Sequence, residues 1–470
     1  MAVVVTRVGY DREVMWADTV PAGDHPTPPG AAARGCDWPA AVSLTAGAEW
    51  RSGYYEVSLT IDVGGRLRTD HAFFVVRPPA DSRNTILLQL ATNTWHAYND
   101  FGGQNLYTGG TTASLQRPMA RGYLYKPPGA GRRVTTTHPP DPDMNTHVGY
   151  LRQHRLSPYA GSAGWPDWEL PFLQWAEREG YGIDVCTNAD LGDHPSMLAS
   201  YRLLLSVGHD EYWSGPMRDT VEGFIARGGN VAFFSGNTSF WQVRLEDHSA
   251  QGPAASMVGY KGQFKRDPVF DTDGVAELTS IWSDHLIGRP ENHMTGVSFS
   301  RGGYHRIGKR VTNGAGGYTI HRPDHWMFDG TGLGYGDVLG AGATIVGYEC
   351  DGCDFTVRDG LPYPTGSDGT PDSFVILGTA PAAHFTRTTA ARPPAPNEPA
   401  EDEFIAARLF GTRDPAAVER ISHGHAVLGS YTSPAGGTVV TSGCTDWAHG
   451  LAGRDAQVER ITANVLERLG

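Results

Sequence analysis

One short stretch, residues 203–212, constrains the fold of this chain more than any other. Its first six residues are mostly apolar and end in a glycine, which predicts a buried strand. Four polar side chains follow directly: His209, Asp210, Glu211 and Tyr212. In open α/β sheets, ligands bind just beyond the carboxyl ends of the strands. An imidazole, two carboxylates and a phenol therefore stand where a site is expected.

The sequence around this stretch predicts an α/β domain with a parallel sheet over residues 85–470. Further apolar strands alternate with segments of helical period and are expected at 86–90, 183–186, 230–235 and 438–441. Helices are expected at 168–179, at 458–469 and between Ser214, the predicted N-cap, and Gly228. Residues 241–435 show only short strand signals, at 344–346 and 374–377. Long loop insertions are therefore expected there.

Residues 1–80 have a different character, because their apolar positions alternate and no helical period is visible. Strands are expected at 54–61 and 71–76, joined by a hairpin turn at Gly64 and Gly65. We expect a small antiparallel β-sandwich, immunoglobulin-like and incomplete at its start. The prolines 78 and 79 mark its boundary.

Charge and hydropathy exclude several classes of protein. The net charge is −13 and no cluster of Lys and Arg forms a basic face, so nucleic acid is not an expected partner. No apolar run is long enough to span a bilayer, and the first residues lack the features of a secretory signal. We expect a soluble, cytoplasmic protein without a membrane partner.

Five cysteines, an odd number in a long chain, fit a reducing compartment better than a disulfide framework. Cys350 and Cys353 form a single CxxC motif without a second pair at zinc-ribbon spacing. We expect a tight turn with two half-buried thiols in preference to a closed zinc site. Their role stays open.

Several familiar catalytic motifs are absent from the sequence. It contains no Gly-x-Ser-x-Gly elbow and no Walker loop, and the glycine-rich run at 330–336 lacks the dinucleotide spacing. No cysteine stands near Gly236 or Asn237, where amidotransferase-like sheets carry a nucleophile. Thiol chemistry of that kind is not expected.

Two interpretations of the polar segment after residue 208 stay open. In the first, the turn at 236–239 after the next strand lies beside it, and the two strand ends form a site. In the second, the carboxylates favour the N-terminus of the following helix and Tyr212 packs beside Trp213, with no catalytic role.

A series of motifs resembles one family, the large catalytic subunit of N,N-dimethylformamidase and related bacterial proteins. The resemblance covers most of residues 30–470. It rests on TWHAYN at 94–99, GGQNLY at 102–107, GHDEYW at 208–213, the run from GGN at 228–230 to Trp241, YK at 260–261, HWMFDGTGL at 325–333 and GYE at 347–349.

This resemblance implies a β-sandwich followed by a domain similar to class I glutamine amidotransferases, a flavodoxin-like sheet. It also implies a mononuclear iron held by two tyrosines and a glutamate. Carried over by position, Tyr212 is one tyrosine and Glu349 the glutamate. Phe240 stands where we expect the second phenol.

Phenylalanine offers no donor to a metal, whereas a phenol binds ferric iron as phenolate. The site would then recruit His209, Glu211 or Asn237, or stay empty. His209 would favour zinc or ferrous iron over ferric iron, since imidazole suits both metals. Iron is therefore the expected cofactor, with zinc as the alternative.

The resemblance implies hydrolysis of a small amide or formamide, with a substrate other than dimethylformamide. A metal would polarise the carbonyl, while Glu211 or His209 takes a proton from water. Asn237 and backbone N–H groups of its turn would stabilise the oxyanion. The expected pocket side chains are Trp95, Tyr98, Asn99, Trp213, Phe240 and Trp241.

Two other functions stay open: a non-catalytic protein that binds a small molecule after losing the metal, and a metal-dependent tailoring enzyme of another reaction type. The family's large subunit works with a small partner subunit. Since this chain begins inside the predicted sandwich, we do not expect that partnership here. An oligomer of identical chains stays open.

Overall fold

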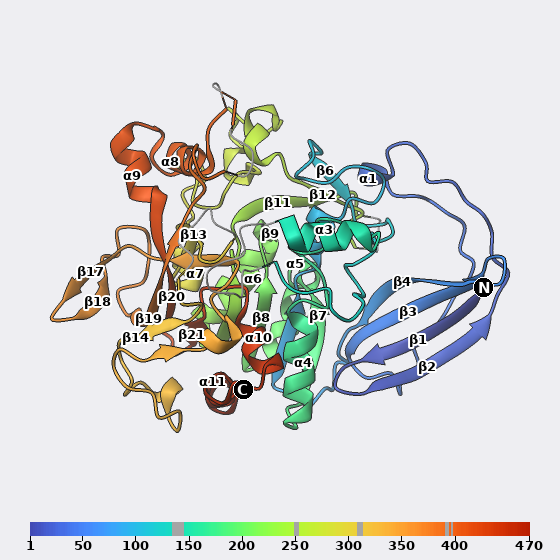
Figure 1. Cartoon of the computed structure of the whole chain (residues 1–470), viewed down its shortest axis with the longest axis horizontal. Helices are drawn as coiled ribbons and strands as arrows, with labels where there is room; N and C mark the ends of the chain where they lie inside the picture. The colour runs from blue at the N-terminus through green and yellow to red at the C-terminus, as the bar shows by residue number, and fades with distance from the viewer. Residues whose placement is uncertain (134–144, 249–252, 308–313, 391–393, 396–397) are drawn as a thin grey trace.

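The computed structural model describes residues 1–133, 145–248, 253–307, 314–390, 394–395 and 398–470 (Figure 1). The first 80 residues form one antiparallel sheet in the order β2-β1-β3-β4. Its strands are β1 (Ala2–Val8), β2 (Arg12–Thr19), β3 (Gly53–Asp62) and β4 (Leu67–Val76). The predicted hairpin between β3 and β4 is confirmed, with positive φ at Gly64 and Gly65.

The predicted β-sandwich needs two facing sheets, and this segment supplies one. Neighbouring residues of a strand point to opposite faces, so Tyr54 and Tyr55 separate. Tyr55 stacks on Trp50 on the outer face, with ring centroids 5.1 Å apart. Tyr54 stacks on Trp165 of the α/β body at 4.1 Å. The body therefore covers the sheet face that a second sheet would cover in a sandwich.

Five parallel strands form the centre of the body. They lie in the order β7-β5-β8-β10-β21 and comprise β5 (Ile86–Leu90), β7 (Ile183–Thr187), β8 (Leu203–His209), β10 (Asn230–Gly236) and β21 (Thr438–Thr441). Numbered along the chain, this order is 2-1-3-4-5, which is that of flavodoxin-like sheets. A closer likeness to glutamine amidotransferases stays a prediction.

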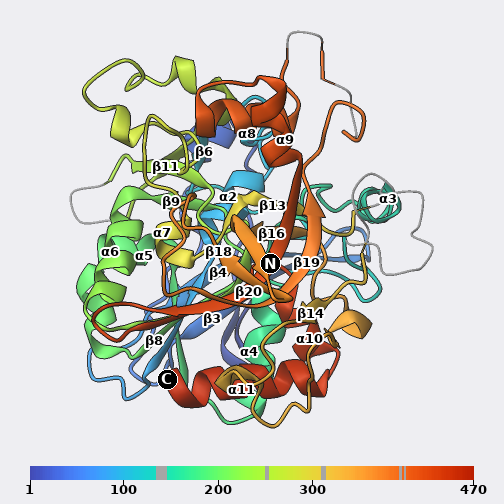
Figure 2. The ribbon, with the colours of Figure 1, turned by 90° about the vertical axis from the view of Figure 1, so that its left-hand side faces the viewer.

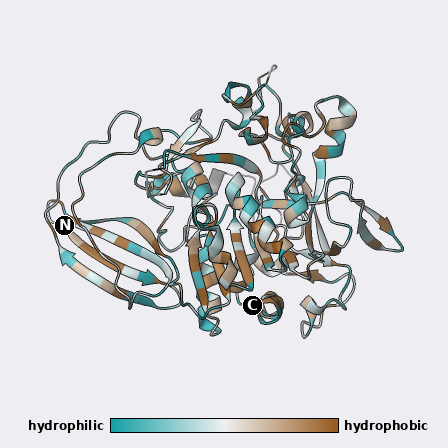
Figure 3. Ribbon diagram, turned by 180° about the vertical axis from the view of Figure 1, so that it is seen from behind, coloured by the Kyte–Doolittle hydropathy of each residue, from teal (hydrophilic) through white to brown (hydrophobic). Residues whose placement is uncertain are grey.

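Helices cover both faces of this sheet, as the strand residues dictate (Figures 2 and 3). In β8, Leu203 and Leu205 belong to the core cluster shared with α4 (Glu169–Arg178), α10 (Trp447–Ala452) and α11 (Ala456–Leu469). Leu204 points the other way, into the cluster shared with α5 (Asn188–Asp193) and α6 (Gly215–Ala226). Ser214 caps α6 as predicted.

Residues 241–435 are less loop-like than predicted, because they extend the sheet with antiparallel strands. These are β13 (Ser298–Tyr304), β14 (Tyr318–Ile320), β15 (Val338–Leu339), β16 (Glu349–Gly352), β19 (Val375–Ala383) and β20 (His423–Thr432). The strand predicted at 344–346 is wrong, since Thr344 has φ of +54° and ends a short 3₁₀ helix. The strand predicted at 374–377 lies largely in β19.

A smaller sheet stands above the carboxyl edge, in the order β6-β12-β11-β9. It comprises β6 (Thr112–Ser114), β9 (Tyr212–Ser214), β11 (Trp241–Glu246) and β12 (Ser256–Val258). The pairing of β9 with β11 sets Tyr212 opposite Trp241. The sequence segment that follows β8 is thereby held against the one that follows β10.

The remaining elements lie around this framework. They are the hairpin β17 (Phe355–Arg358) and β18 (Leu361–Pro364), and the helices α1 (Ala31–Arg34), α2 (Thr92–Tyr98), α3 (Asn145–Gln153), α7 (Asn292–Thr295), α8 (Glu401–Phe410) and α9 (Pro415–Ser422). Within the described part of the chain, none of the helices is long and apolar enough to cross a membrane.

Candidate active site

The candidate site lies at the switch point of the parallel sheet, between β5 and β8. The chain leaves β5 towards β7 on one side and leaves β8 towards β10 on the other, so the carboxyl ends of β5 and β8 open a crevice. α2 follows β5, and His209 is the last residue of β8. β10 brings Asn237 to the same edge, since its Gly236 pairs with His209.

The backbone at this edge has an unusual shape. Gly208 has φ of +82°, and a Cβ there would lie 2.4 Å from the Cβ of Trp168, so glycine is required. Asn237 and Ser239 have positive φ as well, 51° and 57°. Such conformations are strained for residues with a side chain, and strain of this kind gathers at functional sites.

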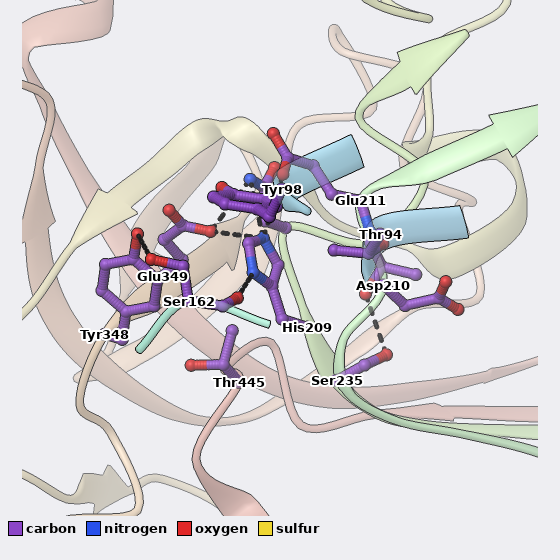
Figure 4. A network of polar contacts seen from close by, with 12 residues as sticks. Thr94, Tyr98, Ser162, His209, Asp210, Glu211, Ser235, Tyr348, Glu349 and Thr445 are labelled. Atoms are coloured by element: carbon purple, nitrogen blue, oxygen red, sulfur yellow. Dashed lines mark hydrogen bonds and ion pairs between the residues drawn. The ribbon is translucent and has the colours of Figure 1, made fainter. Parts of the chain in front are cut away.

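His209 is the centre of the polar cluster (Figure 4). Its Nδ1 lies 2.6 Å from the carbonyl oxygen of Ser162, which can only accept a hydrogen bond, so Nδ1 carries a proton. Its Nε2 lies 2.7 Å from Oε2 of Glu349 and 3.3 Å from Oε2 of Glu211. Both ring nitrogens therefore donate, and the ring is an imidazolium.

The pKa values of these groups follow from burial and mutual charge. Burial alone lowers the pKa of His209, but the charges of Glu349 and Glu211 outweigh it and raise the value to about 9. Burial raises the pKa of Glu349, yet the His209 charge and hydrogen bonds bring it below its ordinary value. Burial dominates at Glu211, whose pKa is raised. One imidazolium therefore lies between two carboxylates.

Glu211 also receives hydrogen bonds from aromatic side chains. The Tyr107 hydroxyl lies 2.7 and 2.8 Å from its two oxygens, and Nε1 of Trp241 donates at 2.6 Å. The Tyr98 hydroxyl lies 2.7 Å from the Tyr107 hydroxyl and extends this series of hydrogen bonds. These bonds fix the carboxylate of Glu211 at the wall of a cavity.

Asn237 contributes its side chain to the site and not its backbone. Its Nδ2 donates to Glu349 at 3.0 Å, while its buried Oδ1 has no hydrogen-bond partner in the described structure. The backbone N–H groups of Asn237 and Thr238 donate to Asp351, at 2.8 and 3.1 Å. The oxyanion donors predicted from the backbone of this turn are therefore occupied.

The cavity has a volume of about 220 Å³. Of the predicted pocket side chains, Tyr98, Phe240 and Trp241 line it. The described residues that line it are Tyr98, Tyr107, Arg133, Tyr159, Ser162, Glu211, Asn237, Phe240, Trp241, Phe299, Tyr304, Tyr348, Glu349 and Glu401. The walls are mainly aromatic, and the polar groups gather around His209.

Three predicted pocket residues have other positions. Trp95 packs against Phe73 in the core and donates its Nε1 to Glu169 at 3.2 Å. Asn99 donates to the carbonyl of Pro118 at 3.0 Å and so braces a loop. Trp213 points to the opposite face of β9 from its neighbour Tyr212 and packs with α6.

Lys261 is a site residue that the sequence interpretation missed. It is buried, has φ of +55°, and donates its Nζ to the Tyr212 hydroxyl at 2.6 Å. The same Nζ lies 3.2 Å from the ring centroid of Tyr107, a cation–π contact. Burial lowers the pKa of Lys261 to about 7. Burial and the Glu211 charge raise the pKa of Tyr212 well above its ordinary value.

The implied iron site does not fit these side chains. Tyr212 is fully buried and is not among the residues that line the cavity, and its oxygen accepts the bond from Lys261. Phe240 has no donor, and Glu349 is neutralised by His209. Within the described ranges, no group of three or more His, Cys, Asp or Glu side chains is arranged to hold a metal ion.

The two cysteines of the CxxC motif do not act together. Cys350 lies in β16, where its Sγ is 3.8 Å from Sγ of Cys444. Cys353 is buried in the core cluster shared with α6. The predicted tight turn with half-buried thiols is wrong, because the strand turns the two side chains to different neighbours.

Other lining residues also escaped prediction, since they come from distant parts of the chain. Tyr107 and Tyr348 stand within motifs that carried the resemblance, GGQNLY and GYE, and that was their one signal. Arg133, Ser162 and Glu401 lie in segments with no motif. They reach the cavity through the tertiary fold.

A parallel sheet of flavodoxin-like strand order, with a buried acid–base cluster and a cavity at its switch point, defines an α/β protein with a candidate site at the carboxyl edge of the sheet. The chain belongs to the family described as N,N-dimethylformamidase beta subunit-like, C-terminal, whose profile matches residues 2–460. This confirms the resemblance drawn from the motifs.

Two curated relatives carry the name N,N-dimethylformamidase beta subunit. The protein from Paracoccus aminophilus is 23% identical over 328 residues, which are 64% of this chain and 36% of the relative. The protein from Alcaligenes sp. is 22% identical over 330 residues, 64% of this chain and 37% of the relative. The matched region thus spans little more than a third of each relative.

Proposed function

We propose that this protein hydrolyses a small amide in the cavity beside His209. The observation that carries the proposal is the pair of glutamates, Glu211 and Glu349, that flank one imidazolium at the wall of a cavity. The names of the curated relatives point to amide hydrolysis as well. The cavity volume of about 220 Å³ suits a small amide.

Glu211 is the base in this mechanism. His209 cannot accept a further proton, because both of its nitrogens already face acceptors. Glu211 takes a proton from water as the water attacks the carbonyl carbon, and then returns it to the leaving amine. Water and amide thereby become a carboxylic acid and an amine.

A neutral donor stabilises the oxyanion of the tetrahedral intermediate. Asn237 lines the cavity, and its Nδ2 carries two hydrogens, of which one bonds Glu349. The other hydrogen donates to the oxyanion. A donor held in place in this way stabilises such charge strongly.

The experiment is an assay of the purified chain with formamide, acetamide, N-methylformamide and dimethylformamide, in which the released amine or ammonia is measured. Glu211→Gln should lower kcat by about 10²- to 10⁴-fold, the usual contribution of a general base. Glu419→Gln, at an exposed position of α9, is the control and should leave kcat unchanged. Absence of hydrolysis by a folded chain, both of these amides and of N-formyl amino acids, overturns the proposal.

A second function, small-molecule binding without turnover, is favoured by two features of the site. Phe240 lines the cavity without a donor, and Lys261 occupies the oxygen of Tyr212. In that case the same amides would bind, as calorimetry would detect, without release of amine.

A further inference from the structure

Arg133 is the one cationic side chain among the described residues that line the cavity. Its guanidinium donates through Nη1 to the Ser162 hydroxyl and lies 5.0 Å above the ring centroid of Tyr348. Its Nε is buried and has no hydrogen-bond partner among the described residues. No carboxylate of the described residues forms an ion pair with it. Buried guanidinium groups are ordinarily paired, so this one is under-satisfied.

The three carboxylates among the described lining residues, in contrast, are already satisfied. Glu211 and Glu349 share His209 and receive further hydrogen bonds. Glu401 accepts from the Tyr304 hydroxyl at 3.1 Å and from the backbone N–H of Phe385 at 2.9 Å. The unmet demand in the cavity is therefore for an anion.

Resting on the proposed amide hydrolysis, we infer that the substrate carries a carboxylate that pairs with Arg133. The planar guanidinium fork matches a carboxylate in geometry and charge. The cavity volume of about 220 Å³ equals that of about seven water molecules at liquid density. A short N-acyl amino acid of about that many non-hydrogen atoms fits this space, with its amide left for the Glu211 end.

The test is a calorimetric comparison of N-formylglycine with N-formylglycinamide, which has the same size but no charge. The wild-type chain should bind the carboxylate at least about tenfold more tightly, because a buried charge-assisted pair is lost with the amide. In Arg133→Met this ratio should fall to about one, and Arg133→Lys should restore part of it. Equal binding of the two ligands by the wild type overturns the inference.

Arg132 provides the matched control. It is the neighbouring arginine, it donates to the Ala343 carbonyl at 2.9 Å, and it is not among the lining residues. Arg132→Met should keep the wild-type preference for the carboxylate. If Arg133→Met fails to fold, as thermal unfolding would show, Arg133→Gln replaces it. Persistence of the preference in the folded Arg133 variant contradicts the inference.

Inorganic phosphate is the second ligand, because a guanidinium also pairs with phosphate oxygens. If phosphate binds more weakly than N-formylglycine, the result supports a substrate carboxylate. If phosphate binds more tightly, the result overturns the inference. Turnover is scored separately by formate release. Binding through Arg133 without formate would sink the proposed hydrolysis and leave the inference standing. Hydrolysis of neutral amides, without tighter binding of the ligand that carries a carboxylate, would support the proposed hydrolysis and overturn the inference about Arg133.

Discussion

His209 and Lys261 are two basic side chains that contact the carboxylates and phenols of the site. His209 joins Glu349 and Glu211, and Lys261 donates to Tyr212 and lies over Tyr107. His209 and Lys261 thus find partners within the chain, whereas the guanidinium of Arg133 has no carboxylate partner among the described residues. The implied tyrosine–tyrosine–glutamate set lacks one phenol and has a competitor for the other.

These contacts predict the metal content of the purified chain. We expect well below one iron per chain in the wild type, and a clear rise when Phe240→Tyr is combined with Lys261→Met, which supplies the missing phenol and frees the other. Elemental analysis measures the iron, and visible absorption reports phenolate bound to ferric iron. Phe240→Leu with Lys261→Met is the control. One iron per wild-type chain would contradict the prediction.

At the scale of elements, the ends of the strands position the side chains of the site, and the helices stabilise the sheet that carries them. β8 and β10 end side by side, and α11 covers one face of the same sheet through Val458, Ile461 and Val465. The N-cap of α11 is Asp455, whose carboxylate accepts from the backbone N–H of Gln457 and Val458 at 3.1 Å each. The cap satisfies donors that the helix leaves unpaired.

Asp455→Ala should therefore destabilise the chain by about 1 kcal/mol, the typical cost of losing an N-cap. Urea unfolding, followed by circular dichroism, should show a lower midpoint with an unchanged slope. Asp455→Asn retains an accepting oxygen and should stay close to the wild type. If both variants unfold alike at the wild-type midpoint, the cap has no part in stability.

At the scale of the whole molecule, the N-terminal sheet and the α/β body are joined by specific contacts. Arg7 forms an ion pair with Glu177 of α4 at 2.6 Å, and the Ser52 hydroxyl accepts from the backbone N–H of Val185 at 2.8 Å. Together with the stack of Tyr54 on Trp165, these bonds extend one core across both parts.

Stability of the whole chain should depend on pH through Glu291, which is fully buried at the start of α7. Burial raises its pKa to about 8, with Arg218 acting against the shift and Asp351 adding to it. The native state then holds a proton that the unfolded state releases above its ordinary pKa of about 4.3. This contribution is present below that value and is lost as pH rises through 8.

Glu291→Gln removes this titration. Its thermal unfolding temperature should fall less than that of the wild type between pH 6 and pH 8.5, because the amide needs no proton to stay neutral. Glu419→Gln, at an exposed position, should keep the wild-type pH profile. Parallel curves for Glu291→Gln and the wild type would show that Glu291 does not titrate as argued.

The local sequence determined the parallel core and the place of the site, because apolar runs, glycines and caps act through near neighbours. Residues 203–212 were enough to put His209 and Glu211 at a strand end, and β5, β7, β10 and β21 followed from the same pattern. The same reasoning failed between 241 and 435, where short strands pair with distant partners and leave no long alternation.

Only the tertiary structure decided what the polar groups do. Ser162 fixes the protonation of His209 from 47 residues away, and Lys261 reaches Tyr212 from 49 residues away. Arg133 becomes under-satisfied because folding places it in the wall of the cavity without a carboxylate partner among the described residues. Hydrogen bonding, burial and charge pairing depend on which residues are neighbours in space, and local sequence patterns do not predict those neighbours.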